Sequence, residues 1–304
     1  MDNKSDKCTK CGCALDLPSQ ASGVCSECRA AGGAPLKNDL TKALDEIEAG
    51  AGYEEIEPSA YLPFKMTKQQ AEKKFGQWLR GIWFAPSKIQ DMIDRNEFTG
   101  TYIPFWSFDC KVEAGYLGSK GTISLKSKQD MEGRSFKKKE LSWATVSGDV
   151  DYNFYDLLIP ANESMGAQEI ARISPWDLDG LLAYEPKAVE TFNVESCQVE
   201  LPEAFKRAKR SMIKVMRQLI KEDIGGDEQE ISTETYEYPV GTYQRILLPI
   251  WVSSYTYNGK SYRVLINGRT GRITGERPRS WQKIAIATVV PFLVLLGGLW
   301  YLLS

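Results

Sequence analysis

The chain has 304 residues, which is room for one large domain or two modest ones. Its composition, 42% hydrophobic, 26% charged and 11% aromatic, is that of a folded protein and excludes a disordered or collagen-like chain. Lys and Arg number 38 against 40 Asp and Glu, so the net charge of -2 indicates neither a general nucleic-acid binder nor an acidic solvating protein. The absence of histidine excludes Ser-His-Asp and Cys-His nucleophiles, histidine zinc sites and imidazole proton shuttles.

The first chemical signal is a pair of C-x-x-C turns, Cys8 with Cys11 and Cys25 with Cys28. Each turn directs two sulfurs at one centre, and two such turns joined by a short hairpin make a tetrahedral thiolate site. We therefore predict a structural Zn²⁺ ion on these four cysteines. Iron in the same cage and a redox dithiol pair are chemically allowed alternatives, and Cys13 is a surplus thiol that could replace one ligand.

At the other end, Ile284 to Leu303 is a run without a single charge. At about 1.5 Å per residue it reaches roughly 30 Å, the thickness of a bilayer's hydrocarbon core. The run predicts a transmembrane helix over 283–303; a buried core helix is disfavoured because apolar residues surround the whole helix. Arg277, Arg279 and Lys283 precede the run, so the positive-inside rule predicts a single-pass protein of the cytoplasmic membrane with its N-terminus in the cytoplasm.

Between these ends, residues 31–61 read as an acidic linker. Leu36, Leu40, Leu44 and Ile47 recur at helical spacing and predict a short amphipathic helix over 36–48. An acidic run follows without basic residues and is either a solvated face or a docking segment; it comprises Asp45, Glu46, Glu48, Glu54, Glu55 and Glu57.

The body, 62–280, shows helical and extended patterns together. Thr67-x-x-Gln70 predicts a capping box that opens a helix, whose inner face would hold Phe75, Trp78, Leu79 and Ile82. Patterns typical of strands cover 101–112, 116–125 and 141–149, separated by Gly, Lys and Ser clusters. Near the end of the body, Asn258-Gly259 and Asn267 to Gly271 predict the turns of a β-meander over 243–275.

A further helix is predicted from Pro202 to about Asp223, with Gly225 just past its end. Its apolar face would hold Phe205, Ala208, Met212, Val215, Met216 and Leu219. A basic stripe on the opposite face could meet anionic lipid, nucleic acid, an acidic partner or only solvent; it comprises Arg207, Arg210, Lys214, Arg217 and Lys221.

Three other groups of residues have structural interpretations. Asp177 and Asp179 are expected to cap a helix, and Cys110 and Cys197 are expected to be small buried hydrophobes. The large aromatics are expected to be core anchors; they are Trp83, Trp106, Trp143, Trp176 and Trp251. No catalytic constellation is found, so an enzyme is not predicted.

Several strings resemble a family of uncharacterised bacterial zinc-ribbon membrane proteins: Leu62 to Phe64, Gly81 to Pro86, Gly100 to Trp106, Ile246 to Trp251 and Asn267 to Gly271. Members are often labelled primosomal protein N' (replication factor Y) or TFIIB-type zinc-finger proteins. Some are encoded beside phage-shock-protein-A-like and flotillin-like proteins, which implies a part in envelope stress or membrane organisation. The helicase label does not suit this chain, because Gly259-Lys260-Ser261 lacks the earlier glycine of a phosphate-binding loop, having Ser254 instead.

The predicted fold class is α+β. A small zinc ribbon (1–30) and an acidic linker with a short helix (31–61) precede a mixed α/β cytoplasmic body rich in antiparallel strands (62–280) and a single transmembrane helix (283–303). The predicted function is a non-enzymatic, tail-anchored membrane adaptor or scaffold. Its expected partners are membrane lipid and proteins of the phage-shock-protein-A-like or flotillin-like kind. The alternative is a membrane-tethered, replication-related nucleic-acid binder, which is less favoured because acidic residues surround the cysteines.

Overall fold

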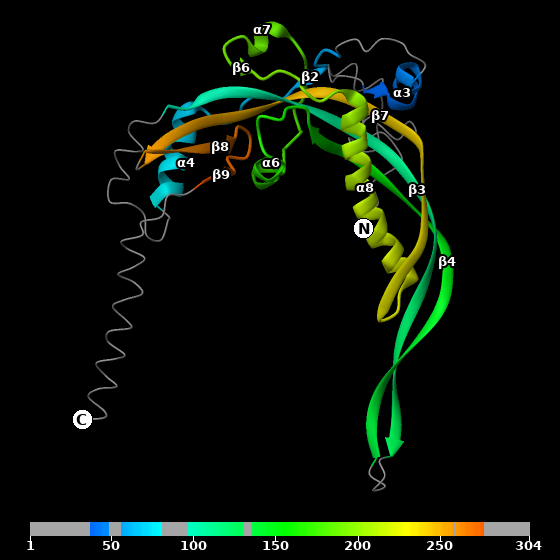
Figure 1. The fold of residues 1–304 in the computed structure, drawn as a ribbon. Helices are drawn as coiled ribbons and strands as arrows, with labels where there is room; N and C mark the ends of the chain where they lie inside the picture. The colour runs from blue at the N-terminus through cyan, green and yellow to red at the C-terminus, as the bar shows by residue number, and fades with distance from the viewer. Residues whose placement is uncertain (1–36, 49–55, 81–96, 130–134, 258, 277–304) are drawn as a thin grey trace, which may run out of the picture. The chain divides into compact units, whose positions relative to one another are not determined.

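The computed structural model describes residues 37–48, 56–80, 97–129, 135–257 and 259–276. These ranges contain a nine-stranded sheet with the order β4-β3-β7-β2-β5, in which β1 and β8 pair with β7, β6 pairs with β3 and β9 pairs with β8 (Figure 1). The strands are β1 (Asn38–Asp39), β2 (Ala60–Tyr61), β3 (Thr99–Gln129), β4 (Ser135–Pro160), β5 (Leu182–Ala183), β6 (Asn193–Val194), β7 (Glu228–Tyr257), β8 (Lys260–Asn267) and β9 (Ile273–Gly275). The helices are α3 (Leu40–Glu48), α4 (Lys68–Arg80), α6 (Ala167–Ile173), α7 (Pro186–Val189) and α8 (Leu201–Ile224).

The predicted α+β fold class is wrong. A single large sheet dominates the described residues, and β3 and β7 alone run for 31 and 30 residues where the sequence predicted several short strands. No helix in the described ranges is long and apolar enough to span a bilayer. The predicted localisation as a single-pass membrane protein depends on such a helix and is corrected by the same finding. The segments predicted as zinc ribbon (1–30) and transmembrane helix (283–303) lie outside the described residues.

The chain divides into two compact units, each assembled from three segments. Unit 1 comprises 1–59, 105–161 and 199–246, and unit 2 comprises 60–104, 162–198 and 247–304. The strands β3 and β7 contribute residues to both units. The domain boundaries that the sequence predicted at 30, 61 and 280 stay predictions.

In unit 1, α8 packs against β4, and the Tyr116 hydroxyl of β3 also reaches Asp223 near the end of the helix. The helix predicted over 202–223 is confirmed, with Pro202 in its first turn and Gly225 at positive φ (64°) ending it. Its buried face includes Phe205, Met212 and Met216 as expected, but Val215 is 41% exposed and Ile220 is buried in its place. The apolar face is therefore rotated slightly from the predicted one.

The strands β3 and β4 form a long antiparallel ribbon whose register runs from Phe105–Pro160 to Gln129–Ser135. It is interrupted once, between Phe108 and Cys110, where two β4 residues oppose one β3 residue. One of the two is Asp156, whose φ of 49° lies in the left-handed region that Asp tolerates better than most residues. The glycine and serine clusters that suggested breaks in β3 are therefore interior positions of one strand.

In unit 2, α4 covers one end of the core. The predicted capping box is confirmed: the Gln70 backbone N–H donates to Thr67 Oγ1 (3.3 Å), and the Thr67 N–H donates to Gln70 Oε1 (3.0 Å). Phe75 and Leu79 are buried as predicted, whereas Ile82 lies outside the described residues. The α4 face packs on a cluster drawn from β7, β8 and the residue before β3, which includes Phe98, Trp251, Tyr255, Val264 and Ile266.

The end of unit 2 is the predicted meander, and this prediction is confirmed. The strands β7 and β8 pair from Ile250–Asn267 to Tyr257–Lys260, with Gly259 at φ 75° in the turn. In the second turn, Asn267 Oδ1 accepts hydrogen bonds from the Arg269 and Thr270 backbone N–H groups.

The expectation that Asp177 and Asp179 cap a helix is wrong, because no helix begins in the described chain between them and Pro186. Asp177 instead accepts charge-assisted bonds from Lys65 (2.5 Å) and Arg269 (3.0 Å), and Arg269 also donates to the Asp179 carbonyl. These two cations, led by the Lys65 hydrogen bond, lower the pKa of Asp177. The aspartates therefore hold a loop of unit 2 together.

Candidate protein-binding surface

The β3–β4 ribbon in unit 1 has one covered face and one open face. Val112, Ala114 and Tyr116 alternate along β3 on the covered face and are buried. The Tyr116 hydroxyl donates to Asp223 Oδ2 (2.5 Å) near the end of α8, so the helix lies over this face. Because side chains alternate along a strand, the odd-numbered β3 residues beyond the bulge lie on the other side of the sheet.

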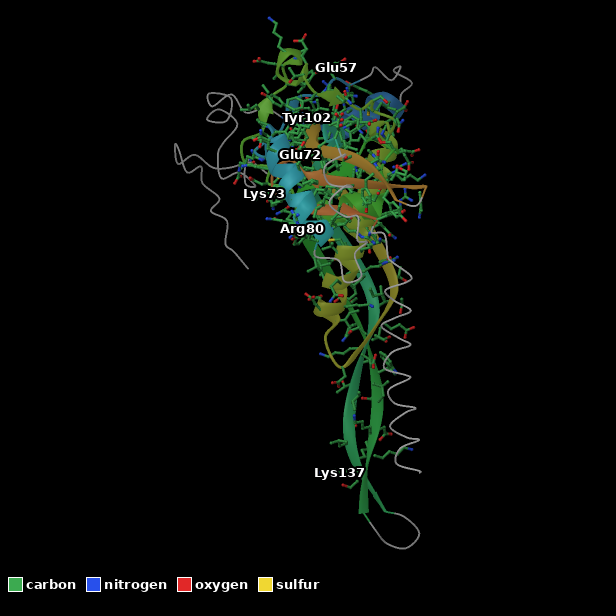
Figure 2. The ribbon with its side chains drawn as sticks, turned by 90° about the vertical axis from the view of Figure 1, so that its left-hand side faces the viewer. Glu57, Glu72, Lys73, Arg80, Tyr102 and Lys137 are labelled. Atoms are coloured by element: carbon green, nitrogen blue, oxygen red, sulfur yellow. The ribbon has the colours of Figure 1, made fainter. Side chains whose placement is uncertain are left out.

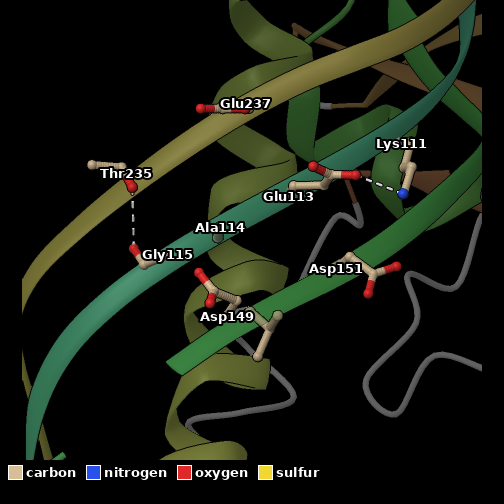
Figure 3. Close-up of a pocket in the computed structure, with 9 residues that line it drawn as sticks. Lys111, Glu113, Ala114, Gly115, Asp149, Asp151, Thr235 and Glu237 are labelled. Atoms are coloured by element: carbon tan, nitrogen blue, oxygen red, sulfur yellow. Dashed lines mark hydrogen bonds and ion pairs between the residues drawn. The ribbon is translucent and has the colours of Figure 1, made fainter. Parts of the chain in front are cut away.

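Near the root of the ribbon, the open face carries an acidic hollow of about 340 Å³ (Figure 3). We use this name for the hollow around the carboxylates of Glu113, Asp149, Asp151 and Glu237. Glu113 stands directly opposite Asp151 in the register, an arrangement of like charges that is unfavourable unless a cation compensates it. Lys111 Nζ supplies part of that compensation at 2.6 Å from Glu113, and this hydrogen bond raises the pKa of the Lys111 ammonium.

The hollow exists because β3 has a glycine at its centre. A Cβ atom on Gly115 would lie 3.1 Å from Asp149 Oδ1 and 3.3 Å from Thr235 Oγ1. Thr235 donates to the Gly115 carbonyl (3.3 Å), which ties β7 to β3 at this point. A larger residue at this position would fill the space between the carboxylates, so the concavity is a property of the sequence.

Farther along the ribbon, the same face becomes apolar. We call the following five side chains, each between 39% and 60% exposed, the apolar stripe: Leu117, Ile123, Leu125, Leu141 and Trp143. Ile123 pairs with Leu141 and Gly121 pairs with Trp143 in the register, so the members from both strands share one face. The start of β7 borders the stripe at Gly121, where an added Cβ atom would lie 2.8 Å from the Glu228 Cβ atom. Beyond this point the ribbon extends past the ends of α8 and β7 (Figure 1), and all five side chains stay exposed.

At the far end of the ribbon, the open face becomes basic. Lys139 pairs with Leu125 and Lys137 pairs with Ser127, so both lysines lie on the face of the stripe. Figure 2 shows Lys137 close to the tip of the ribbon. Lys138 pairs with Lys126 on the opposite face, where Lys126 forms an ion pair with Glu140 (2.7 Å). The open face therefore runs from acidic through apolar to basic.

A second charged group in unit 1 lies at the bulge and is buried. The Lys37 ammonium, 5% exposed, donates to Asp109 Oδ1 (2.6 Å) and Asp156 Oδ1 (2.7 Å). Asp109 Oδ1 also accepts the Asp156 backbone N–H (2.7 Å), while Oδ2 has no hydrogen-bond partner among the described residues. Burial raises the pKa of Asp109, and the Lys37 charge opposes that rise. Because Lys37 and Asp109 are buried and Lys37 pairs with both aspartates, these groups hold the bulge together and offer no open site.

The basic stripe predicted on α8 is largely paired. Glu203 accepts hydrogen bonds from Arg207 (3.2 Å) and Arg210 (3.3 Å), and Glu234 on β7 pairs with Arg217. The pKa values of both glutamates are lowered, chiefly by their hydrogen bonds to Arg207 and Arg217 respectively. Three of the five cations that suggested a phosphate contact are therefore neutralised by carboxylates of the same unit.

The predicted metal ligands Cys8, Cys11, Cys25 and Cys28 lie outside the described residues, so zinc binding at these positions stays a prediction. Within the described ranges, no group of three or more Cys, Asp or Glu side chains has the geometry of a metal site. The sequence led us to expect a metal-binding, membrane-spanning protein, and this expectation is corrected for the described residues, which contain neither a metal site nor a membrane-spanning helix. Of the two cysteines in the described ranges, Cys110 is buried as expected, whereas Cys197 is only partly buried.

The apolar stripe was missed because its tryptophan was assigned to the core. Trp106 and Trp251 are buried as expected, but Trp143 is 49% exposed and Trp176 is partly buried. Trp83 lies outside the described residues. The short alternations Leu141-Ser142-Trp143 on β4 and Ile123-Ser124-Leu125 on β3 could have signalled a face needing cover.

Comparison with known proteins gives little further guidance. No family model matches the chain. An uncharacterised protein of Bacillus subtilis (strain 168), YdjG, is 23% identical over 236 residues, which covers 76% of this chain and 66% of YdjG. No solved structure matches. The relative carries no stated activity, so the functional argument rests on the open face of the ribbon.

Proposed function

We propose that this chain is a non-enzymatic adaptor or scaffold that binds protein through the open face of its β3–β4 ribbon. The observation that carries the proposal is the apolar stripe, which joins five large exposed side chains on one face of one ribbon. Contiguous exposed apolar surface edged by charged groups is typical of protein-interaction sites in soluble folds. Scattered single hydrophobic residues would carry no such implication.

Nucleic-acid binding is the weaker proposal for the same unit. Phosphate recognition needs lysines and arginines that are free to release counterions, whereas Arg207, Arg210 and Arg217 are engaged by glutamates. The acidic hollow also lies on the face that carries the two tip lysines and would repel a phosphate backbone.

The proposal is tested by placing a photo-crosslinking amino acid at Trp143 of the full chain in its native cell. The matched control places the same group at Ala144, which is exposed on the opposite face of the same strand. We expect crosslinked protein from position 143 and little from position 144, identified in each case by mass spectrometry. The phage-shock-protein-A-like and flotillin-like proteins that the family resemblance implies are the first candidates besides the chain itself.

A captured protein is then purified and titrated against the wild type and Trp143→Lys. Placing a charge in the middle of an apolar contact is expected to weaken binding at least about tenfold. Equal crosslinking at the two positions, or none at either, would refute the proposed function.

A further inference from the structure

The order of charges along the open face suggests what binds there. Carboxylates lie at the root, apolar side chains lie in the middle, and Lys137 and Lys139 lie at the tip. Position 120 of β3 is midway between Glu113 at the root and Ser127, which pairs with Lys137 at the tip. At about 3.3 Å per residue, the whole face is roughly 46 Å long.

Such a face is complementary to itself when one of two copies is turned end to end. A two-fold axis near position 120 would place the tip lysines of each copy over the acidic hollow of the other. The same rotation places the apolar stripe of one copy on that of its partner. A parallel arrangement would oppose acid to acid and base to base, and like charges across an interface are strongly unfavourable.

We propose that the partner bound by the open face is a second copy of this chain, in an antiparallel two-fold dimer of β3–β4 ribbons. This rests on the proposed protein-binding function and names the partner. In the dimer, Lys137 and Lys139 pair with Glu113, Asp149 and Asp151 of the other copy, and Trp143 is covered near the axis. The partner's tip lysines add to Lys111, the cation that the root already carries in a single copy.

The size of the face sets the expected strength of the dimer. Two strands about 4.8 Å apart give a face roughly 10 Å wide, so two copies bury on the order of 1,000 Å², near the lower limit of specific interfaces. We therefore expect monomer and dimer to exchange, with a dissociation constant of about a micromolar or more.

Sedimentation velocity of the purified full chain over a concentration series tests the dimer. Two charge-reversal variants sharpen the test: Lys137→Glu with Lys139→Glu makes both ends of the face acidic, and Asp149→Lys with Asp151→Lys makes both ends basic. Each variant alone should associate at least about tenfold more weakly than wild type, because like charges then meet at both ends. Mixed in equal amounts, the two variants should form a heterodimer, since acidic ends then meet basic ends.

Lys138→Glu is the matched control, because it reverses a charge at the same tip on the opposite face. It should dimerise like the wild type, and circular dichroism should show the same fold for all variants. A wild type that stays monomeric to about 100 μM would overturn the inference. So would variants that dimerise normally alone, a mixture that fails to associate, or a control that weakens as much as Lys137→Glu with Lys139→Glu.

The proposed function and this inference fail differently. A monomeric chain whose position 143 crosslinks another protein in the cell refutes the dimer and leaves the adaptor. The absence of any crosslink at position 143 refutes both.

Discussion

The two units differ in how far they bury a tryptophan side chain. In unit 2, Trp251 is 7% exposed, its Nε1 donates to the Met66 carbonyl (3.0 Å), and its ring lies 4.8 Å from that of Phe64. In unit 1, Trp143 is 49% exposed and stands over Gly121 on the open face of the ribbon. Unit 2 completes its own aromatic core. Unit 1 presents an apolar face that its described residues do not cover, and such a face is expected to be covered by another molecule.

Replacing each tryptophan with alanine tests whether the two side chains differ in their contribution to stability. Trp251→Ala should destabilise the chain by about 3–5 kcal/mol, because it removes a buried ring and leaves a cavity. Trp143→Ala should change the stability of the dilute monomer by less than about 0.5 kcal/mol, because the side chain is half exposed. Urea unfolding followed by far-ultraviolet circular dichroism measures both. Similar losses for the two variants would mean that Trp143 is covered within the monomer.

The comparison extends to charges. Lys37 is 5% exposed between two aspartates, whereas Lys126 is 62% exposed beside Glu140. Lys37→Met should cost about 3 kcal/mol at neutral pH, since it leaves Asp109 buried without its cation. Lys126→Met is the control and should cost less than about 1 kcal/mol. Urea unfolding of both variants provides the measurement.

The pH dependence of stability provides a second test of the Lys37–Asp109 ion pair. Burial raises the pKa of Asp109 above its unfolded value, so the native state holds that proton more tightly and stability falls as the pH rises through the folded pKa. Lys37 opposes the rise, and its removal raises the pKa of Asp109 further. The loss in Lys37→Met should therefore be smallest near pH 4, about the unfolded value, and largest near neutral pH. A pH-independent loss would contradict this account.

The smallest effect is expected where the covered face of the ribbon meets the end of α8. Tyr116→Phe removes the hydrogen bond to Asp223 and should cost about 1 kcal/mol. Burial and this hydrogen bond raise the pKa of Tyr116 to about 12, so the stabilisation is present below about pH 10 and is lost as the pH rises through the folded value. Urea unfolding at neutral and alkaline pH should show the difference from wild type shrinking. Tyr152→Phe, at a 44% exposed site, should have little effect at any pH.

The local signals in the sequence predicted the local structure well. The Thr67 and Gln70 capping box, the helix from Pro202 and the Asn258-Gly259 hairpin each depend on residues close together in the chain, and each is present. The continuous strand β3 was harder, because its glycines look like breaks. Gly118, for example, lies where a Cβ atom would come within 2.9 Å of Ile224 on α8, so it serves close helix packing inside an unbroken strand.

The candidate surface could not be predicted because exposure is a property of the tertiary fold. Trp143 and Trp251 both stand in strand-like sequence. Trp251 is buried because Phe64 and residues of α4 and β8 pack around it, whereas Trp143 lies where the ribbon passes the start of β7. The pairing of the α8 arginines likewise depends on Glu234, a residue of another element. The basic stripe was visible in the sequence, but its neutralisation was not.

The bulge at Asp109 and Asp156 determines which face of the ribbon each β4 side chain beyond it lies on. Beyond this point the side-chain alternation of β4 is offset by one position against β3, and every pair from Cys110–Phe154 to Gln129–Ser135 inherits that offset. Before the bulge, Ile159 and Leu157 of β4 pair with even-numbered residues of β3, whereas beyond it Phe154 and Tyr152 do so. If β4 kept all its residues but paired without the bulge, Trp143 would stand opposite Thr122 and Leu141 opposite Ser124, on the face away from the apolar stripe. The extra residue in β4 therefore keeps both side chains on the open face.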